Sequence, residues 1–311
     1  MPARQNDGVL VAGSINTDLV VLVERAPRAG ETVSGNSFTI FGGGKGANQA
    51  VAAARSGART AMLGAVGNDD FGRQRLASLA EEGIETTGVS TAHDAPSGVA
   101  LILVENSGEN RIAYVPGAAL TVSADHVLAT LDMVRPSVLL TTLELPMDAL
   151  LPLLRAAVDG GVTTILNATP EPSKVKANLA LAQILIANET EARDLLGGQQ
   201  SSWSESADAL RALGPECVLI TLGKAGAVLA DSDGFEEISA PEVEVVDTTG
   251  AGDALCGVFA AEIAKGASRL EAARTGVLAG SLAVTKHGAQ QSMPTRSEIE
   301  SFRQLTNRTK S

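Results

Sequence analysis

Residues 137–143 read SVLLTTL, and three similar runs follow: TTILNA at 163–168, ILIAN at 184–188 and CVLITL at 217–222. Each run is short and almost wholly apolar, which is typical of a strand buried on both faces. Helix patterns lie near residues 148–159, 189–196 and 204–213, two more are predicted at 253–265 and 270–284, and a polar tail is expected from Asn307. The alternation predicts βαβ units and an α/β fold in which helices cover a parallel sheet.

Two earlier segments do not follow this alternation. Residues 17–40 are β-rich, and residues 98–115 contain two strand patterns, GVALILV and RIAYV, separated by a hairpin loop at 105–110. These segments predict either a small separate sheet that acts as a lid or extra edge strands of the main sheet. The pattern alone leaves both interpretations open.

The composition excludes several classes of protein. The chain has 311 residues, of which 44% are hydrophobic and 19% charged, so a disordered chain is excluded. A net charge of -12 and an aromatic content of 3% argue against nucleic acid and anionic lipid as partners. Cys217 and Cys256 are too few for a disulfide framework and are expected to be buried. The polar start and the lack of a long apolar run predict a cytoplasmic protein with no membrane span.

The segment DTTGAGD at 247–253 is the first candidate for chemistry. It follows a predicted strand at 243–246 and leads into a helix pattern, so small residues let backbone N–H groups converge at a helix N-terminus. Gly250, Ala251 and Gly252 would then form an anion hole. Asp253 beside them is either a capping carboxylate or a base that accepts a hydroxyl proton.

A second glycine-rich turn, at Gly42–Asn48, also leads into a helix. Lys45 and Asn48 could hydrogen-bond a small polyhydroxylated ligand, and Asn16 and Asp18 follow the first strand at the edge where such ligands bind. The alternatives are a tight turn with a solvated lysine and turn-forming Asx residues. The patterns of a Walker phosphate loop and of a dinucleotide-binding turn are absent from the sequence.

Four motifs in a fixed order carry a family resemblance: GGKGANQA at 43–50, ANETEA at 187–192, TLGKAG at 221–226 and DTTGAGD at 247–253. Together they resemble the ribokinase-like (phosphofructokinase-B) family of carbohydrate kinases, across nearly the whole chain. The resemblance implies one doubly wound α/β domain over residues 1–311, with a discontinuous β lid at about 17–41 and 97–117. It also implies a homodimer that forms through the lid.

The resemblance further implies an ATP-dependent kinase, most simply one that phosphorylates the 5-hydroxyl of D-ribose. Another sugar (2-deoxyribose, fructose), a nucleoside, or a non-catalytic sugar-binding role are the alternatives. Mg²⁺ and ATP would be required, and K⁺ would activate the enzyme.

Each site residue is implied by its place in a family motif. Asp253 matches the catalytic base, and Gly250, Ala251 and Gly252 match the anion hole. The sugar would contact Asn16, Asp18, Gly43, Gly44, Lys45, Asn48, Glu144 and Asp253. ATP would contact Asn188, Thr221, Gly223, Lys224, Gly226 and Gly252, and Glu191 would organise Mg²⁺. The monovalent cation would be held by Asp247, Thr249, Ala283, Lys286, Gly288 and Ser292, several of them through backbone carbonyls.

Overall fold

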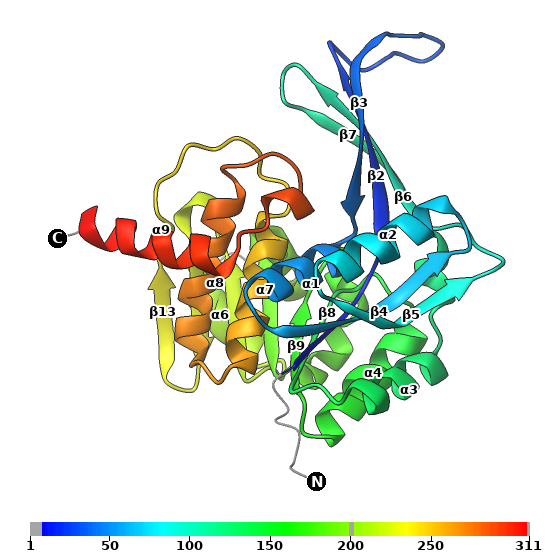
Figure 1. Cartoon of the computed structure of the whole chain (residues 1–311). Helices are drawn as coiled ribbons and strands as arrows, with labels where there is room; N and C mark the ends of the chain where they lie inside the picture. The colour runs from blue at the N-terminus through cyan, green and yellow to red at the C-terminus, as the bar shows by residue number, and fades with distance from the viewer. Residues whose placement is uncertain (1–7, 199–201, 310–311) are drawn as a thin grey trace.

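A nine-stranded, mainly parallel sheet forms the centre of the molecule (Figure 1), in a computed structural model that describes residues 8–198 and 202–309. In spatial order its strands are β13 (Gly234–Ile238), β12 (Ala227–Asp231), β11 (Cys217–Thr221), β10 (Ile184–Asn188), β9 (Thr163–Asn167), β8 (Val138–Thr141), β1 (Gly8–Ala12), β4 (Arg59–Gly67) and β5 (Glu85–Ala92). The strands from β11 to β5 pair in parallel, and β12 and β13 add an antiparallel edge. The predicted parallel sheet is confirmed.

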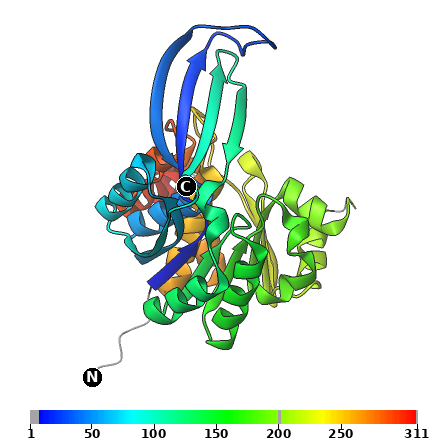
Figure 2. The same cartoon turned by 90° about the vertical axis from the view of Figure 1, so that its right-hand side faces the viewer.

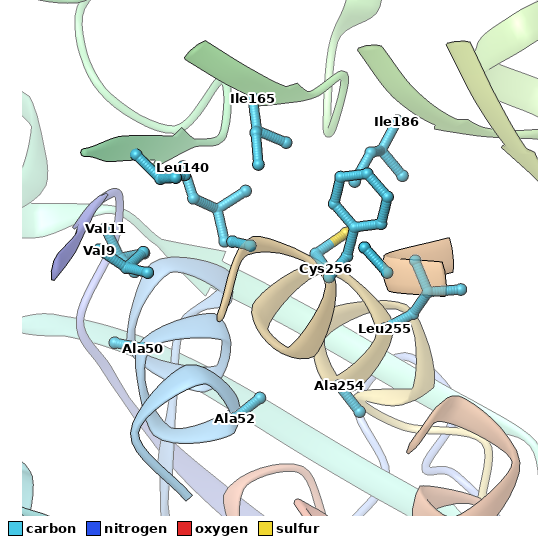
Figure 3. Packing of buried hydrophobic residues seen from close by; sticks show 14 of the residues in the cluster. Val9, Val11, Ala50, Ala52, Leu140, Ile165, Ile186, Ala254, Leu255 and Cys256 are labelled. Atoms are coloured by element: carbon cyan, nitrogen blue, oxygen red, sulfur yellow. The ribbon is translucent and has the colours of Figure 1, made fainter. Parts of the chain in front are cut away.

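Helices cover both faces of this sheet. Their bounds are α1 (Lys45–Arg55), α2 (Asp70–Glu81), α3 (Ala124–Val134), α4 (Met147–Asp159), α5 (Glu189–Leu196), α6 (Trp203–Arg211), α7 (Ala251–Ala264), α8 (Arg269–Ala283) and α9 (Arg296–Thr309). Because successive strand residues point to opposite faces, Val9 and Val11 of β1 belong to one core with α1 and α7, as Figure 3 shows. Leu10 and Ala12 belong to a second core with α3 to α6. The fold is therefore doubly wound.

A second sheet of four strands projects from one end of the main sheet (Figures 1 and 2). Its order is β3 (Gly35–Gly43), β2 (Asn16–Val23), β6 (Gly98–Glu105) and β7 (Asn110–Val115). The two β-rich segments thus form a separate sheet, and the alternative of extra edge strands on the main sheet is wrong. The predicted hairpin is confirmed, because β6 and β7 pair antiparallel.

Two local predictions are wrong. Residues 241–250 form no strand, because this exposed segment has no neighbouring strand to pair with, and the Val246 N–H donates instead to the Val284 carbonyl at 2.8 Å. The expected polar tail is helical as far as Thr309, because α9 packs Ile299 against α7 and α8. Residues 310–311 and the polar start at 1–7 lie outside the described residues. None of the described helices has the length and hydropathy that a bilayer crossing requires.

Candidate active site

The candidate residues gather where the parallel strands end. The chain order reverses at β1, with β4 on one side and β8 on the other, and ligands bind beyond strand ends at such a switch point. A cavity of about 230 Å³ lies at this edge. Its wall is formed by Lys45, Asn167, Thr169, Ile186, Asn188, Glu191, Thr221, Thr248, Gly250, Gly252, Asp253 and Cys256.

Asp253 lies at the start of α7 but does not cap it. The cap position is Gly250, and no side chain bonds to the helix end there. Both carboxylate oxygens of Asp253 instead accept from α1, Oδ2 from Asn48 Nδ2 at 2.9 Å and Oδ1 from Gln49 Nε2 at 3.0 Å. Burial raises the pKa of Asp253, while Lys45 and the two amides oppose that rise. The capping interpretation is therefore wrong, and Asp253 is held as a buried acceptor at the cavity wall.

The turn before α7 provides backbone donors at the same wall. Gly250 has a φ of 79°, a left-handed conformation that glycine adopts without strain. The Ala251 N–H makes a long bond of 3.4 Å to the Thr248 carbonyl. Within the described chain, the Gly252 and Asp253 N–H groups find no backbone acceptor. A helix N-terminus with open donors in a cavity suits an anion, as the sequence predicts for this turn.

Lys45 lies in the cavity wall, so the alternative of a solvated lysine is wrong. Burial alone would lower its pKa, but the carboxylates of Asp253, Glu144 and Glu191 outweigh that effect and raise the pKa. The ammonium group is therefore the positive centre of a cluster of three acidic side chains.

Glu144 approaches the site from the turn after β8. Its Oε2 accepts from Ser14 Oγ at 2.7 Å, Ser14 N at 3.3 Å and Thr142 Oγ1 at 3.1 Å. No donor in the described parts of the chain reaches Oε1. One oxygen is thus used to orient the carboxylate, and the other stays open for a ligand.

Two buried amides nearby have carbonyl oxygens without a partner. Asn16 and Asn48 are 5% and 6% exposed, and the Oδ1 atom of each lacks a donor among the described residues. Asn16 lies in strand β2, where it pairs with Gly43 and Gly98, so the turn interpretation is wrong for it. Unpaired buried acceptors are costly, which makes both oxygens natural acceptors for ligand hydroxyl groups.

The glycines of the second turn allow close packing around these acceptors. A Cβ on Gly43 would collide with the carboxylate of Asp18, and a Cβ on Gly44 would lie 2.7 Å from the Ser14 carbonyl oxygen. Gly44 also has a φ of 91°. The turn therefore brings Asp18 and Asn16 next to the start of α1 without a side chain between them.

The predicted nucleotide residues are only partly brought together. Asn188, Thr221 and Gly252 line the cavity, whereas Gly223, Lys224 and Gly226 are not among its described lining residues. Gly226 has a structural role, because a Cβ there would collide with the Ile238 carbonyl. Asn188 and Glu191 form a capping box on α5, with Asn188 N bonded to Glu191 Oε2 at 2.8 Å. Glu191 still reaches the cavity wall, and burial raises its pKa.

The predicted cation residues lie in two segments that Asp247 joins. Its Oδ1 accepts from Thr249 N and its Oδ2 from Gly288 N, both at 2.9 Å. Lys286 directs its ammonium group to Glu298 at 2.6 Å, away from Asp247. Ser292 is buried and donates to the Ala289 carbonyl at 2.8 Å. The bond from Thr249 N closes an Asx turn, which Asp247 would form with no cation present, whereas the bond from Gly288 N links the two segments.

Comparison with known proteins identifies the family. Residues 6–296 match the family model described as pfkB family carbohydrate kinase. The chain belongs to this family. Ribokinase of Haemophilus influenzae is 38% identical over 298 residues, which cover 94% of this chain and 97% of that protein. Ribokinase from Thermotoga maritima has a similar structure, with a TM-score of 0.87, 30% identity and coverage of 96% and 99%. Arabidopsis thaliana ribokinase complexed with ribose and ATP gives a TM-score of 0.84, 30% identity and coverage of 95% and 98%.

The structure places four further residues in or behind the site of this pfkB kinase, none of which the sequence analysis named as a site residue. Ser14 orients Glu144, and Thr169 lines the cavity. Gln49 and Asn167 bond to each other at 3.0 Å behind Asp253. The sequence offers no local signal for these contacts, since the bonded residues are more than 100 positions apart.

Proposed function

We propose that this pfkB kinase transfers the γ-phosphoryl group of ATP to the 5-hydroxyl of D-ribose, giving ribose 5-phosphate and ADP. The observation that carries the proposal is the surplus of buried acceptors beside the anion turn. Asn16 Oδ1 and Asn48 Oδ1 are buried and lack a donor within the described chain, and a sugar supplies several hydroxyl donors at once. Glu144 Oε1, on a half-buried side chain, adds an acceptor beside them, because the bonds from Ser14 and Thr142 all go to Oε2. The relatives named ribokinase, one of them complexed with ribose and ATP, support the same substrates.

The reaction assigns one role to each part of the site. Asp253 accepts the proton of the 5-hydroxyl as its oxygen bonds to the γ-phosphorus, and the bond from that phosphorus to the ADP oxygen breaks. The N–H groups at Gly250–Gly252 stabilise the negative charge on the transferred group. Lys45 opposes the rise in the pKa of Asp253 that burial causes, and so favours its ionised form, and it adds positive charge on the same side of the cavity.

The residues present fit ATP and Mg²⁺. Asn188 and Thr221 lie at the cavity wall on the ends of β10 and β11, where the nucleotide phosphates would enter. Mg²⁺ bound to ATP keeps several waters and needs few protein carboxylates, and Glu191 supplies one beside Lys45. When bound, the ion neutralises charge on the phosphoryl oxygens. Because ATP is the donor, we place the enzyme in the cytoplasm.

A panel of acceptors tests the substrate. ADP release is measured with ribose, 2-deoxyribose, fructose and adenosine at equal concentration, and ribose is expected to give the highest kcat/KM. A nucleoside or another sugar that exceeds ribose would replace the proposed acceptor. Ribose binding without ribose-dependent ADP release would instead favour a non-catalytic sugar-binding protein.

Sugar binding is expected to weaken below pH 6. Burial raises the pKa of Asp18 to about 6, with Arg75 opposing and Asp253 adding to the rise. A raised pKa means that the carboxylate protonates as the pH falls through 6 and loses its strength as a hydroxyl acceptor. The dissociation constant for ribose, measured by calorimetry from pH 8 to 5, should increase by up to about tenfold per pH unit below 6. The variant Asp18→Asn should bind ribose more weakly at pH 8 and show no change in affinity between pH 8 and 5. A dissociation constant of the native chain that does not change with pH would contradict the role of Asp18.

The Asp247 region suits a monovalent cation. Its donor set is a carboxylate, hydroxyl groups and backbone carbonyls, which are the hard oxygen ligands that such ions prefer. Asp247 also has a lowered pKa, because hydrogen bonds from Thr249 and Gly288 outweigh the effect of burial, so it is anionic at neutral pH. We infer that a K⁺ ion between the two segments would fix the turn that presents the Gly250 and Gly252 N–H groups.

K⁺ is therefore expected to raise kcat well above the value in Na⁺, with little change in the KM for ribose. A loosely held anion turn loses donors that are each worth roughly 3 kcal/mol in the transition state. Rates in K⁺, Na⁺ and a bulky organic cation at constant ionic strength measure the effect, and Asp247→Ala should abolish the difference. Equal rates in all three cations would leave Asp247 with only its turn-forming role.

The four-stranded sheet is the proposed lid and dimer contact. Phe38, Leu101 and Ile112 on three of its strands are 60%, 52% and 61% exposed, so this sheet leaves large apolar side chains in water, as a protein interface does before it is covered. Neighbouring residues of a strand alternate between faces, so Leu101 and Ile112 lie on opposite faces of the sheet. Light scattering should give a dimer mass, and Leu101→Asp should give a monomer; a monomeric native chain would contradict the proposal.

A further inference from the structure

Gln49 of helix α1 contacts the proposed base without touching the cavity. Its side chain is fully buried, and among the described residues the cavity wall includes its partners Asn167 and Asp253 but not Gln49 itself. Gln49 Nε2 lies 3.0 Å from Asp253 Oδ1 and 3.0 Å from Asn167 Oδ1. The Gln49 amide nitrogen therefore donates one hydrogen to Asn167 at the end of β9 and the other to Asp253 in α7.

The neighbouring bonds fix which end of each amide faces which way. Asn167 Nδ2 donates to the Ile186 carbonyl at 3.3 Å, so its Oδ1 must be the atom that faces Gln49. Gln49 then meets two acceptors, and only its nitrogen can satisfy them. The opposite orientation would place three oxygens together.

This orientation leaves Gln49 Oε1 buried without a donor in the described structure. An unpaired buried acceptor destabilises a fold, and an apolar side chain of the same length would avoid it. The same apolar side chain would, however, remove the donor to Asp253 Oδ1 and Asn167 Oδ1, so the amide is explained by the two bonds that it donates. What the amide adds is a fixed donor to the carboxylate of Asp253.

We propose that Gln49, oriented by Asn167, is a positioning residue that holds the Asp253 carboxylate in its reactive orientation while Asn48 holds the other oxygen. The inference rests on the proposed role of Asp253 as the base. Gln49 acts only through Asp253, whereas Asn48 also offers an unpaired Oδ1 to the substrate.

The same bond affects the charge of the base. Burial favours the protonated form of Asp253, and the groups that face it are Lys45 from α1, Asp18 from β2, Glu144 from the turn after β8 and the Cys256 thiol on α7. Lys45 and the two amide donors favour the ionised form. Without Gln49 the carboxylate would bind a proton at higher pH, so the acid limb of the kcat profile would move upward.

The test compares kcat, KM and pH profiles in the full chain. Gln49→Met keeps the length of the side chain and removes both donors. We expect a roughly 10-fold loss of kcat, a KM for ribose within about threefold, and an acid limb shifted up by about half a pH unit or more. Gln183→Met is the control, because Gln183 is a partly buried amide at the opposite end of strand β10 from the cavity, where its Oε1 accepts from Thr164 N at 3.1 Å. It should leave the pH profile unchanged.

A double variant separates this inference from the proposed function. In the Asp253→Asn background, Gln49→Met should cost less than about twofold, because its effect passes through the carboxylate. An equal loss in both backgrounds, or an unshifted acid limb, would overturn the positioning role. Near-normal turnover of the single variant Asp253→Asn would overturn the proposed role of Asp253 as the base.

Gln49→Glu gives a second measurement if the methionine variant does not fold. Its new carboxyl group donates to Asp253 only when protonated. Its activity should therefore fall at high pH relative to the native chain and recover as the pH falls, opposite to Gln49→Met. An unchanged pH optimum would count against the proposal.

Discussion

Asp253→Asn is expected to lower kcat by about 10² or more while ribose affinity stays within a few-fold. The amide cannot accept the hydroxyl proton, but it nearly preserves the volume of the side chain and keeps one oxygen that can accept from α1. Binding requires hydroxyl acceptors and no base, so the loss should fall on turnover. Rates of ADP release and calorimetric binding of ribose measure the two effects separately.

A matched substitution controls for the chemical change. Asp208→Asn makes the same replacement at an exposed position of α6, where Asp208 pairs with Arg211 on the surface. It should leave both kcat and ribose binding unchanged. Turnover of Asp253→Asn close to that of the native chain would show that some other group accepts the proton.

Lys45→Met should affect activity and stability together. The ammonium group compensates Asp253, Glu144 and Glu191, and its removal leaves three partly or fully buried carboxylates facing one another. We expect kcat/KM to fall by about 10² or more. We also expect the free energy of unfolding to fall by about 2 kcal/mol at pH 8.

The stability loss should shrink at lower pH. Without the lysine, the pKa values of the three carboxyl groups rise in the folded protein, so the folded state binds protons at a pH where the unfolded chain does not. The variant therefore regains stability as the pH falls from 8 to 5, which urea unfolding at both pH values can measure. Lys174→Met, which removes an exposed pair with Glu171, should cost less than about 1 kcal/mol at either pH. A deficit for Lys45→Met that does not depend on pH would argue against charge compensation.

The elements that the sequence predicted well are those whose signal is local. Strands β8 to β11 are continuous apolar runs, and the αβ alternation follows from them. Val243–Val246 has the same β-branched character, but strand formation needs a partner, and the neighbouring chain supplies only single hydrogen bonds. Helix α9 at the end of the chain shows the opposite case, in which a weak local pattern is stabilised by a distant contact. Ile299 alone gives little pattern, yet it anchors α9 on α7 and α8.

The residues of the candidate site also separate into those with a local sequence signal and those placed by long-range contacts. Asp253, Lys45 and Asn48 lie in glycine-rich motifs that can be recognised in the sequence, and the structure brings them together. Gln49 follows Asn48 in the same motif, but the sequence does not indicate its contacts, because its partners are 118 and 204 positions away. Glu191 shows the reverse case. Its motif is visible in the sequence, but the capping box on α5 is an equally complete reason for the pattern.

The residues that would hold the sugar stand at the root of the small sheet. Asn16 begins β2, Asp18 follows two positions later, and Gly43 ends the paired strand β3. Any swing of that sheet about its base must move these groups, while Asn188 and Thr221 stay fixed in the main sheet. If the sheet moves as the proposed lid, sugar occupancy and the tilt of the sheet would therefore form one coupled equilibrium. By reciprocity, a partner that favoured one tilt, such as a second subunit on the proposed dimer contact, would then change the affinity for the sugar by the same factor as the sugar changes its own.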